Sequence, residues 1–209
     1  MDSEGALKGD ILVKYTGSEA LERRLDANDT DAVGFNKQLE DELKALLPNG
    51  ASVKAVKVEG TEGSAEPLLA SFSVEVPSFG SITGKRMLLP SSLFQGSRKS
   101  AFQAVTRKFP VYFAYAYAEI DNLKLKIPAG YKLETAPANA DAGIPYASYH
   151  NEVSVNGSEL AAHRELKMNG VFFKVDQYGE VRDFFSRVQA GDEQQAVLQG
   201  GALSAQSGN

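Results

Sequence analysis

Alternation of hydrophobic and polar residues predicts β-strands along much of the chain. A period of two residues places successive side chains on opposite faces of a sheet, so these segments are expected to be strands with one buried face. The segments with this pattern are residues 11–15, 56–59, 72–76, 123–127, 131–133 and 153–155. Further strands are expected in segments that are rich in apolar and aromatic residues or that follow a turn. These segments are residues 82–89, 105–117, 160–168 and 196–198.

Turn residues separate these strands. Asn156-Gly157 lies between two apolar runs and predicts a tight β-hairpin. The stretch from Pro137 to Pro145 is interpreted as a loop. Pro110 lies inside the segment 105–117, and a proline cannot donate to a strand ladder, so it indicates an edge, a bulge or a strand start.

Two segments have hydrophobic residues at helical spacing. In the first, Phe35, Leu39, Leu43, Leu46 and Leu47 form one stripe. Residues 29–31 offer good helix caps before it, and Pro48-Asn49-Gly50 ends it. The second amphipathic helix is expected at residues 177–189, with these residues on its apolar face: Val181, Phe184, Phe185 and Val188. A short additional helix is expected after Ser18, which we interpret as its cap.

These elements predict an α+β fold of mostly antiparallel, sandwich-like sheets with two amphipathic helices. Regular alternation of strands and helices is missing, which argues against doubly wound and barrel folds. The polar stretch 95–100 is the expected linker between two domains. We therefore expect a mixed β/α domain at residues 6–97 and a β-rich domain with one helix at 104–198. Residues 199–209 are rich in Gly, Ser and Gln and are expected to form a disordered tail.

Composition and charge exclude several classes of protein. The chain has 209 residues, a formal net charge of −5 and no cysteine. The negative charge argues against binding nucleic acid through bulk positive charge, so no nucleic-acid partner is expected. The lack of thiols removes cysteine nucleophiles, disulfides and thiolate metal sites. The longest apolar run, 111–118, is too short for a transmembrane helix, and no signal peptide precedes the first strand, so no membrane insertion is expected.

Catalytic and metal-binding residues are not indicated by any motif. The only histidines are His150 and His163, and neither has a nucleophile and an orienting acid at a characteristic spacing. The acidic residues 26–31 are better explained by helix capping than by a calcium loop. We therefore expect no catalytic residue, no cofactor and no metal site.

The most suggestive feature is a run of aromatic residues. If 111–117 is one strand, then Phe113, Tyr115 and Tyr117 share a face, because alternate side chains point the same way. Such a face is either a platform for a sugar or peptide or part of the core. The candidate contact residues are Tyr112, Phe113, Tyr115, Tyr117 and Tyr131.

The second half of the chain resembles a known bacterial family. The resemblance is carried by residues 107–113 (RKFPVYF), 127–134 (IPAGYKLE) and 181–185 (VRDFF), together with Tyr149 and the strand around Arg164. These segments are similar to the C-terminal region of exported bacterial transglutaminase-like proteins, domain of unknown function 3858, which occurs beside domain of unknown function 3857. With weaker features around Gly17, Arg24 and Pro67, the resemblance covers residues 6–198.

The resemblance implies a longer parent protein. In this family a papain-like transglutaminase core with a Cys-His-Asp centre lies upstream, and none of those residues has a counterpart here. The chain is therefore expected to be a non-catalytic accessory region, located in the periplasm or outside the cell. Its expected partner is the transglutaminase-like domain of the same parent chain, or else a protein, peptide or glycan. The alternative is a carbohydrate-binding β-sandwich module that uses the aromatic strand face.

Overall fold

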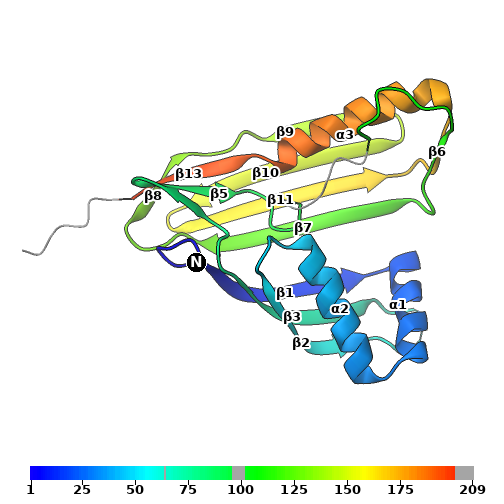
Figure 1. Ribbon diagram of the computed structural model, residues 1–209, viewed down its shortest axis with the longest axis horizontal. Helices are drawn as coiled ribbons and strands as arrows, with labels where there is room; N and C mark the ends of the chain where they lie inside the picture. Colours follow the sequence, from blue (N-terminus) through cyan, green and yellow to red (C-terminus); the bar gives the residue numbers. More distant parts are fainter. Residues whose placement is uncertain (64, 96–101, 201–209) are drawn as a thin grey trace, which may run out of the picture.

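The computed structural model describes residues 1–63, 65–95 and 102–200. Within these residues the α+β fold is confirmed, with three α-helices and antiparallel strands in four sheets (Figure 1). The predicted tail lies almost entirely outside the described residues, as does most of the predicted linker.

A small three-stranded sheet forms one layer of the molecule. In spatial order its strands are β1 (Leu7–Tyr15), β3 (Leu68–Val76) and β2 (Ser52–Glu59). Helix α2 (Ala32–Leu46) covers this sheet with Phe35, Leu39 and Leu43, as the helical stripe predicts. The predicted cap is confirmed, because the side chain of Asp31 accepts a hydrogen bond of 2.7 Å from the backbone N–H of Gly34.

A longer four-stranded sheet forms the centre of the molecule. Its strands, in spatial order, are β7 (Tyr117–Lys126), β11 (Glu159–Met168), β10 (Ala147–Asn156) and β9 (Ala140–Ile144). Asn156 pairs with Glu159 across the β10–β11 turn, so the predicted hairpin is confirmed. Helix α3 (Tyr178–Asp192) packs on β9 and β10 through Val181, Phe184 and Val188.

Two smaller sheets complete the fold. One contains, in spatial order, β4 (Ser81–Thr83), β5 (Arg86–Pro90), β13 (Gln195–Gly200) and β8 (Tyr131–Thr135). The other is a short ribbon of β6 (Val111–Tyr112) and β12 (Phe172–Phe173), which is followed by the 3-10 turn η1 (Val175–Gln177).

The hydrophobic core runs through both halves of the chain. One cluster of buried side chains joins Leu39 and Phe72 of the first layer to Met87 of β5, Leu160 of β11 and Leu198 of β13. The three-stranded sheet therefore shares its core with elements that follow residue 85. A second cluster lies under α3 and is rich in aromatic residues.

Several predicted boundaries are wrong, each for a local reason. The expected strand 82–89 is a hairpin of β4 and β5, because Gly84 takes a positive φ of 61° and turns the chain. The expected loop 137–145 contains β9, which pairs with β10 despite its weak strand propensity. Helix α1 (Gly17–Asp29) begins after Thr16, so Ser18 is inside it and does not cap it. On β2 a bulge between Ala55 and Lys57 leaves Val56 exposed.

The largest difference concerns the expected strand 105–117. Within it β6 is strand and Tyr117 begins β7, while residues 113–116 form an irregular connection between the two strands. Pro110 lies immediately before β6, in agreement with its predicted place at a strand start. The three aromatic residues expected to share one strand face are therefore not on one strand.

Candidate functional site

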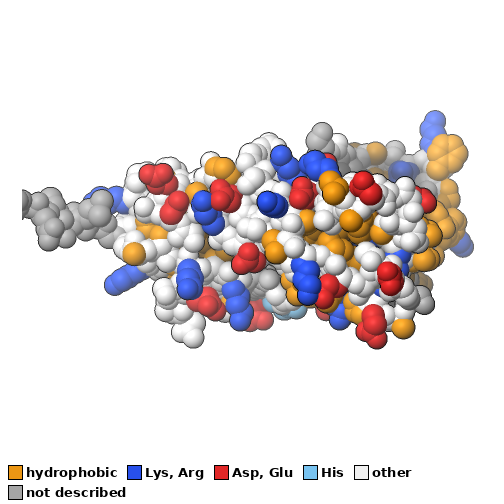
Figure 2. Space-filling model, turned by 90° about the horizontal axis from the view of Figure 1, so that it is seen from below, with side chains coloured by type: hydrophobic (Ala, Val, Ile, Leu, Met, Phe, Trp, Pro, Cys, Tyr) orange, Lys and Arg blue, Asp and Glu red, His pale blue; other side chains and the backbone are white. Residues whose placement is uncertain are grey.

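Four aromatic side chains are exposed, and all four belong to one end of the molecule. The chain has 8 Tyr, 11 Phe and no Trp, and the structure describes all of them. The four exposed ones are Phe109 (76%), Tyr112 (71%), Phe172 (56%) and Tyr146 (50%), and we call them the aromatic end. In Figure 1 the β6 ribbon lies at the right-hand end, beside the start of α3. Figure 2 shows hydrophobic side chains gathered toward the right-hand end of another face.

Backbone hydrogen bonds hold the segments of the aromatic end together. Phe172 lies opposite Tyr112 in the β6–β12 ribbon, and the N–H of Phe113 donates to the carbonyl of Val171 at 2.8 Å. The carbonyl of Tyr146, in the β9–β10 turn, accepts from the N–H groups of Asn169 (2.8 Å) and Gly170 (3.1 Å).

Gly170 is required by the packing at this end. A Cβ atom at this position would lie 2.6 Å from Cζ of Phe173 and 2.9 Å from Cβ of Tyr146. Both distances are shorter than carbon–carbon contacts allow. The absence of a side chain thus lets the turn and the ribbon approach closely.

A buried set of rings supports the exposed ones. The ring of Phe113 lies 6.1 Å from Phe173, 6.1 Å from Tyr117 and 6.3 Å from Phe185, between centroids. These rings belong to the second core cluster, under α3. In addition, the hydroxyl of Tyr178 donates to the carbonyl of Ala104 at 2.6 Å. The exposed side chains thus belong to segments that pack on buried rings, and this order lowers the conformational entropy that would be lost on binding a partner.

The predicted contact residues are found in different environments. Tyr112 is exposed, whereas Phe113, Tyr117 and Tyr131 are partly buried against the two core clusters. Tyr115 donates its hydroxyl to Oε1 of Glu19 on α1 at 2.5 Å. This hydrogen bond, together with desolvation, raises the pKa of Tyr115 to about 12. The five residues do not form one continuous surface.

Sequence reasoning did not single out Phe109, Tyr146 and Phe172, the other three exposed aromatic residues. Each lies within two residues of a Pro or Gly, where the chain turns at the surface. A large aromatic side chain beside such a turn is the signal that could have found them.

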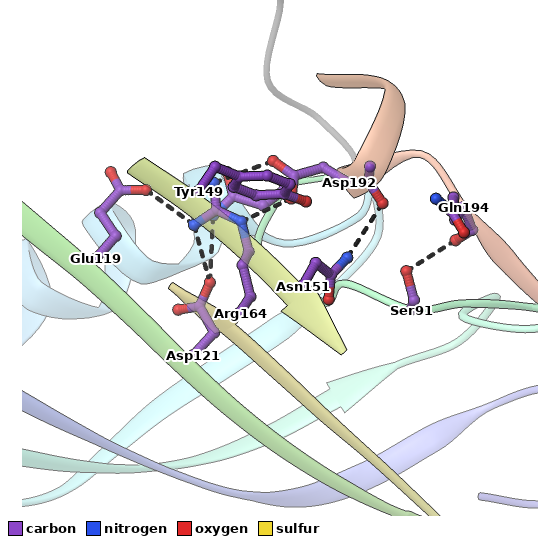
Figure 3. Close-up of polar contacts among 10 residues, drawn as sticks. Ser91, Glu119, Asp121, Tyr149, Asn151, Arg164, Asp192 and Gln194 are labelled. Carbon is purple, nitrogen blue, oxygen red and sulfur yellow. Dashed lines mark hydrogen bonds and ion pairs between the residues drawn. The ribbon is translucent and has the colours of Figure 1, made fainter. Parts of the chain in front are cut away.

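A buried arginine forms the second notable site (Figure 3). Arg164 on β11 is 3% exposed. Its Nε and Nη2 donate to the two carboxylate oxygens of Asp192, at 2.6 and 3.0 Å. Its Nη1 lies 3.2 Å from Glu119 Oε2 and 3.4 Å from Asp121 Oδ2. The ring of Tyr149 lies beside it, with the guanidinium carbon 5.6 Å from the centroid.

These contacts fasten the end of α3 to the central sheet. Asp192 is the last residue of α3, and it also accepts a 2.8 Å hydrogen bond from the hydroxyl of Tyr149. Burial opposes the charge of Arg164, but the hydrogen bonds and the attraction of Asp192 outweigh it and raise the pKa of Arg164. The pKa of Tyr149 is also raised, mainly by burial and secondly by the negative charge of Asp192. The role of Arg164 is therefore structural, because its guanidinium is enclosed by carboxylates of this chain, which link α3 to the sheet.

The two histidines are neighbours on the outer face of the central sheet. Their ring centroids lie 6.2 Å apart. His150 Nδ1 is 2.8 Å from Asp141 Oδ1, which raises the pKa of His150, and His163 Nδ1 is 2.9 Å from Asn122 Oδ1. Within residues 1–63, 65–95 and 102–200, no three His, Asp or Glu side chains are placed to hold a metal ion.

A groove lies elsewhere, between α1 and residues 61–63 and 65–67. It has a volume of about 700 Å³ and is lined by Ala20, Leu21, Leu25 and Pro67, among others. None of the predicted contact residues lines it. Among the described helices, none has the length and apolar character needed to cross a membrane.

Comparison with known families gives one match. A family described as a Domain of Unknown Function with solved-structure structure (DUF3858) matches residues 85–198. This range is more than half of the chain and contains both the aromatic end and Arg164. No curated protein and no solved structure gives a significant match.

Proposed function

The chain belongs to the DUF3858 family, and from this membership and the exposed aromatic end we propose that it is a non-catalytic accessory domain that docks on another protein. The observation that carries the proposal is the location of all four exposed aromatic side chains at one end of the molecule. Exposed Tyr and Phe side chains are costly in water and are enriched where proteins bind one another.

The support beneath the aromatic end favours docking over a chance exposure. Tyr112 and Phe172 face each other across a two-stranded ribbon, and Gly170 allows the Tyr146 turn to pack beside it. A pre-organised apolar surface loses little side-chain freedom on binding, so more of the contact energy appears as affinity.

The partner we propose is the transglutaminase-like domain of a longer, exported parent chain. The segment 107–113, which carries part of the resemblance to such proteins, also supplies Phe109 and Tyr112. The docking would then take place in the periplasm or outside the cell. Catalysis would belong to the parent's core, and this chain would orient or cover it.

Glycan binding has less support. A sugar platform needs exposed coplanar rings, and Phe113 and Tyr117 pack on other rings while Tyr115 is hydrogen-bonded to Glu19. Tyr112 alone of these four is exposed.

The proposal is tested by titrating the chain with the separately produced transglutaminase-like domain, followed by calorimetry and by amide shifts in NMR spectra. The variant Tyr112→Ser/Phe172→Ser removes two anchors. Anchors of this kind each contribute about 2 kcal/mol, or about 30-fold in affinity, so we expect the double variant to lose between about 30-fold and about 1000-fold. The control Val56→Ser/Ile82→Ser changes two exposed hydrophobic residues, 68% and 47% exposed, on other strands. No heat and no shifts, or equal losses in both variants, would contradict the proposal.

A further inference from the structure

We infer that the aromatic end recognises an acidic protein surface, in which carboxylates surround an apolar contact. This inference rests on the proposed docking function and adds the chemistry of the partner. It follows from the charges of the segments that present the aromatic side chains.

These segments carry positive charges only. Residues 102–113, 144–147 and 169–175 contain Arg107, Lys108 and Lys174, and no Asp or Glu. All three cations are exposed. The whole chain has a net charge of −5, so the aromatic end is a local exception to the charge of the molecule.

The neighbouring acidic residues lie outside the three segments and offset their charge only in part. Asp176 follows in η1 and Glu180 lies in the first turn of α3, two carboxylates against the three cations of the segments, while Asp183 on α3 is paired with Arg182 at 2.9 Å. Arg182 also donates to the carbonyl of Val105 at 3.2 Å, so the Arg182–Asp183 pair holds the segment that leads to Phe109 without changing its net charge. Positive charge around an apolar centre is the complement of an acidic rim on a partner.

A second copy of this chain fits the surface poorly. Two aromatic ends that met face to face would bring Lys108 and Lys174 of each copy together, and like charges across an interface are unfavourable. An anionic membrane also fits less well, because surface binding of that kind uses clusters of about 4–8 basic residues. An acidic protein surface satisfies both the aromatic residues and the cations.

The roles of the cations are not identical. The guanidinium of Arg107 lies 5.6 Å from the ring centroid of Tyr178 and 6.0 Å from that of Phe102, so it also supports the buried rings. Lys108 and Lys174 are therefore the residues to change in order to test the effect of charge without disturbing the packing of the buried rings.

The test is selection of peptides from a random library displayed on phage, with the full chain as bait. We expect enrichment of peptides that combine aromatic or aliphatic residues with several Asp or Glu, competed by excess free chain. The variant Lys108→Glu/Lys174→Glu should bind the selected peptides about tenfold more weakly in low salt, with a smaller difference in high salt. The control Lys14→Glu/Lys54→Glu makes the same charge change on β1 and β2 and should bind as the wild type does.

The other outcomes separate the inference from the proposed function. Peptides lost by Tyr112→Ser/Phe172→Ser but without acidic residues would overturn the inference and leave docking intact. Co-sedimentation with phosphatidylserine vesicles that depends on Lys108 and Lys174, without peptide enrichment, would overturn it in favour of lipid. A dimer by light scattering that Phe172→Ser dissociates would overturn it in favour of self-association. Enrichment that Tyr112→Ser/Phe172→Ser leaves unchanged would overturn the inference and count against the aromatic end as the docking site.

Discussion

Replacing Arg164 by methionine should lower the stability of the protein strongly. The guanidinium is 3% exposed and contacts three carboxylates, those of Asp192, Glu119 and Asp121. Its removal leaves these side chains, which are 9%, 27% and 23% exposed, close together without their shared cation. Breaking one side of a buried ion pair costs about 3–5 kcal/mol, because the remaining charge stays desolvated.

This loss is large on the scale of the whole fold. Domains have free energies of unfolding of about 5–15 kcal/mol, and for a chain of this size 1 kcal/mol corresponds to about 2–4 °C in Tm. We therefore expect Arg164→Met to lower Tm by about 6–20 °C in calorimetry and to shift the urea midpoint to match. Amide hydrogen exchange should accelerate in α3 before the rest, because Asp192 fastens its end.

The matched control is Arg86→Met. Arg86 donates from Nε to Glu134 Oε2 at 2.7 Å, but its side chain is 57% exposed. Water screens such a pair, so Tm should stay within the error of the measurement. If Arg164→Met unfolds during expression, Asp192→Asn serves instead, because it weakens the same ion pair more mildly. The Tm of Asp192→Asn should lie between those expected for Arg164→Met and Arg86→Met. Equal Tm values for Arg164→Met and Arg86→Met would refute the reasoning.

Three further predictions concern the same structure. Tyr149→Phe removes the hydroxyl that donates to Asp192 at 2.8 Å, so urea unfolding should show a loss of about 1–2 kcal/mol, and an unchanged midpoint would contradict the contact. The hydrogen bond that His150 donates to Asp141 raises the pKa of His150 above 6.5, so the stabilisation from this contact is fully present below about pH 6.5 and is lost as pH rises through the raised pKa. In Asp141→Asn the NMR titration of His150 should therefore move to lower pH, whereas in Asp183→Asn it should not move. Gly170→Ala forces a Cβ against Phe173 and Tyr146, so we expect a loss of about 1–3 kcal/mol and broadened NMR signals for the β6–β12 ribbon, and a Tm equal to the wild type would show that the turn relaxes freely.

Much of the fold was predictable because its periodicities are clean. The stripe of Phe35, Leu39 and Leu43 identified α2, and its cap at Asp31 was among the residues expected there. Alternation identified β3 and β7, and Asn156-Gly157 identified the β10–β11 hairpin. In these elements local propensity and burial agree, so the sequence alone was sufficient.

Residues 105–117 show where that reasoning failed. Their content of Val, Tyr and Phe is typical of a strand, but Phe113 is partly buried among rings from α3 and β12, which are far along the chain. Tertiary packing there outweighs strand propensity. Of the candidate contact residues in this segment, only Tyr112 is exposed.

Arg164 was partly visible in the sequence. On β11 it shares a face with Leu160 and Leu166, so an inward-pointing charge follows from the alternation alone. A buried guanidinium requires acidic partners. The identity of the main partner, Asp192, could not be predicted, because it depends on how α3 packs on the sheet.

The most direct test of the docking proposal is hydrogen-exchange mass spectrometry of the chain, alone and bound to the transglutaminase-like domain. We predict slower exchange on binding in residues 105–113, 144–147 and 169–175, with no change on the outer strand β2. Protection confined to other segments, such as the groove between α1 and residues 65–67, would contradict the proposal and place the docking surface there.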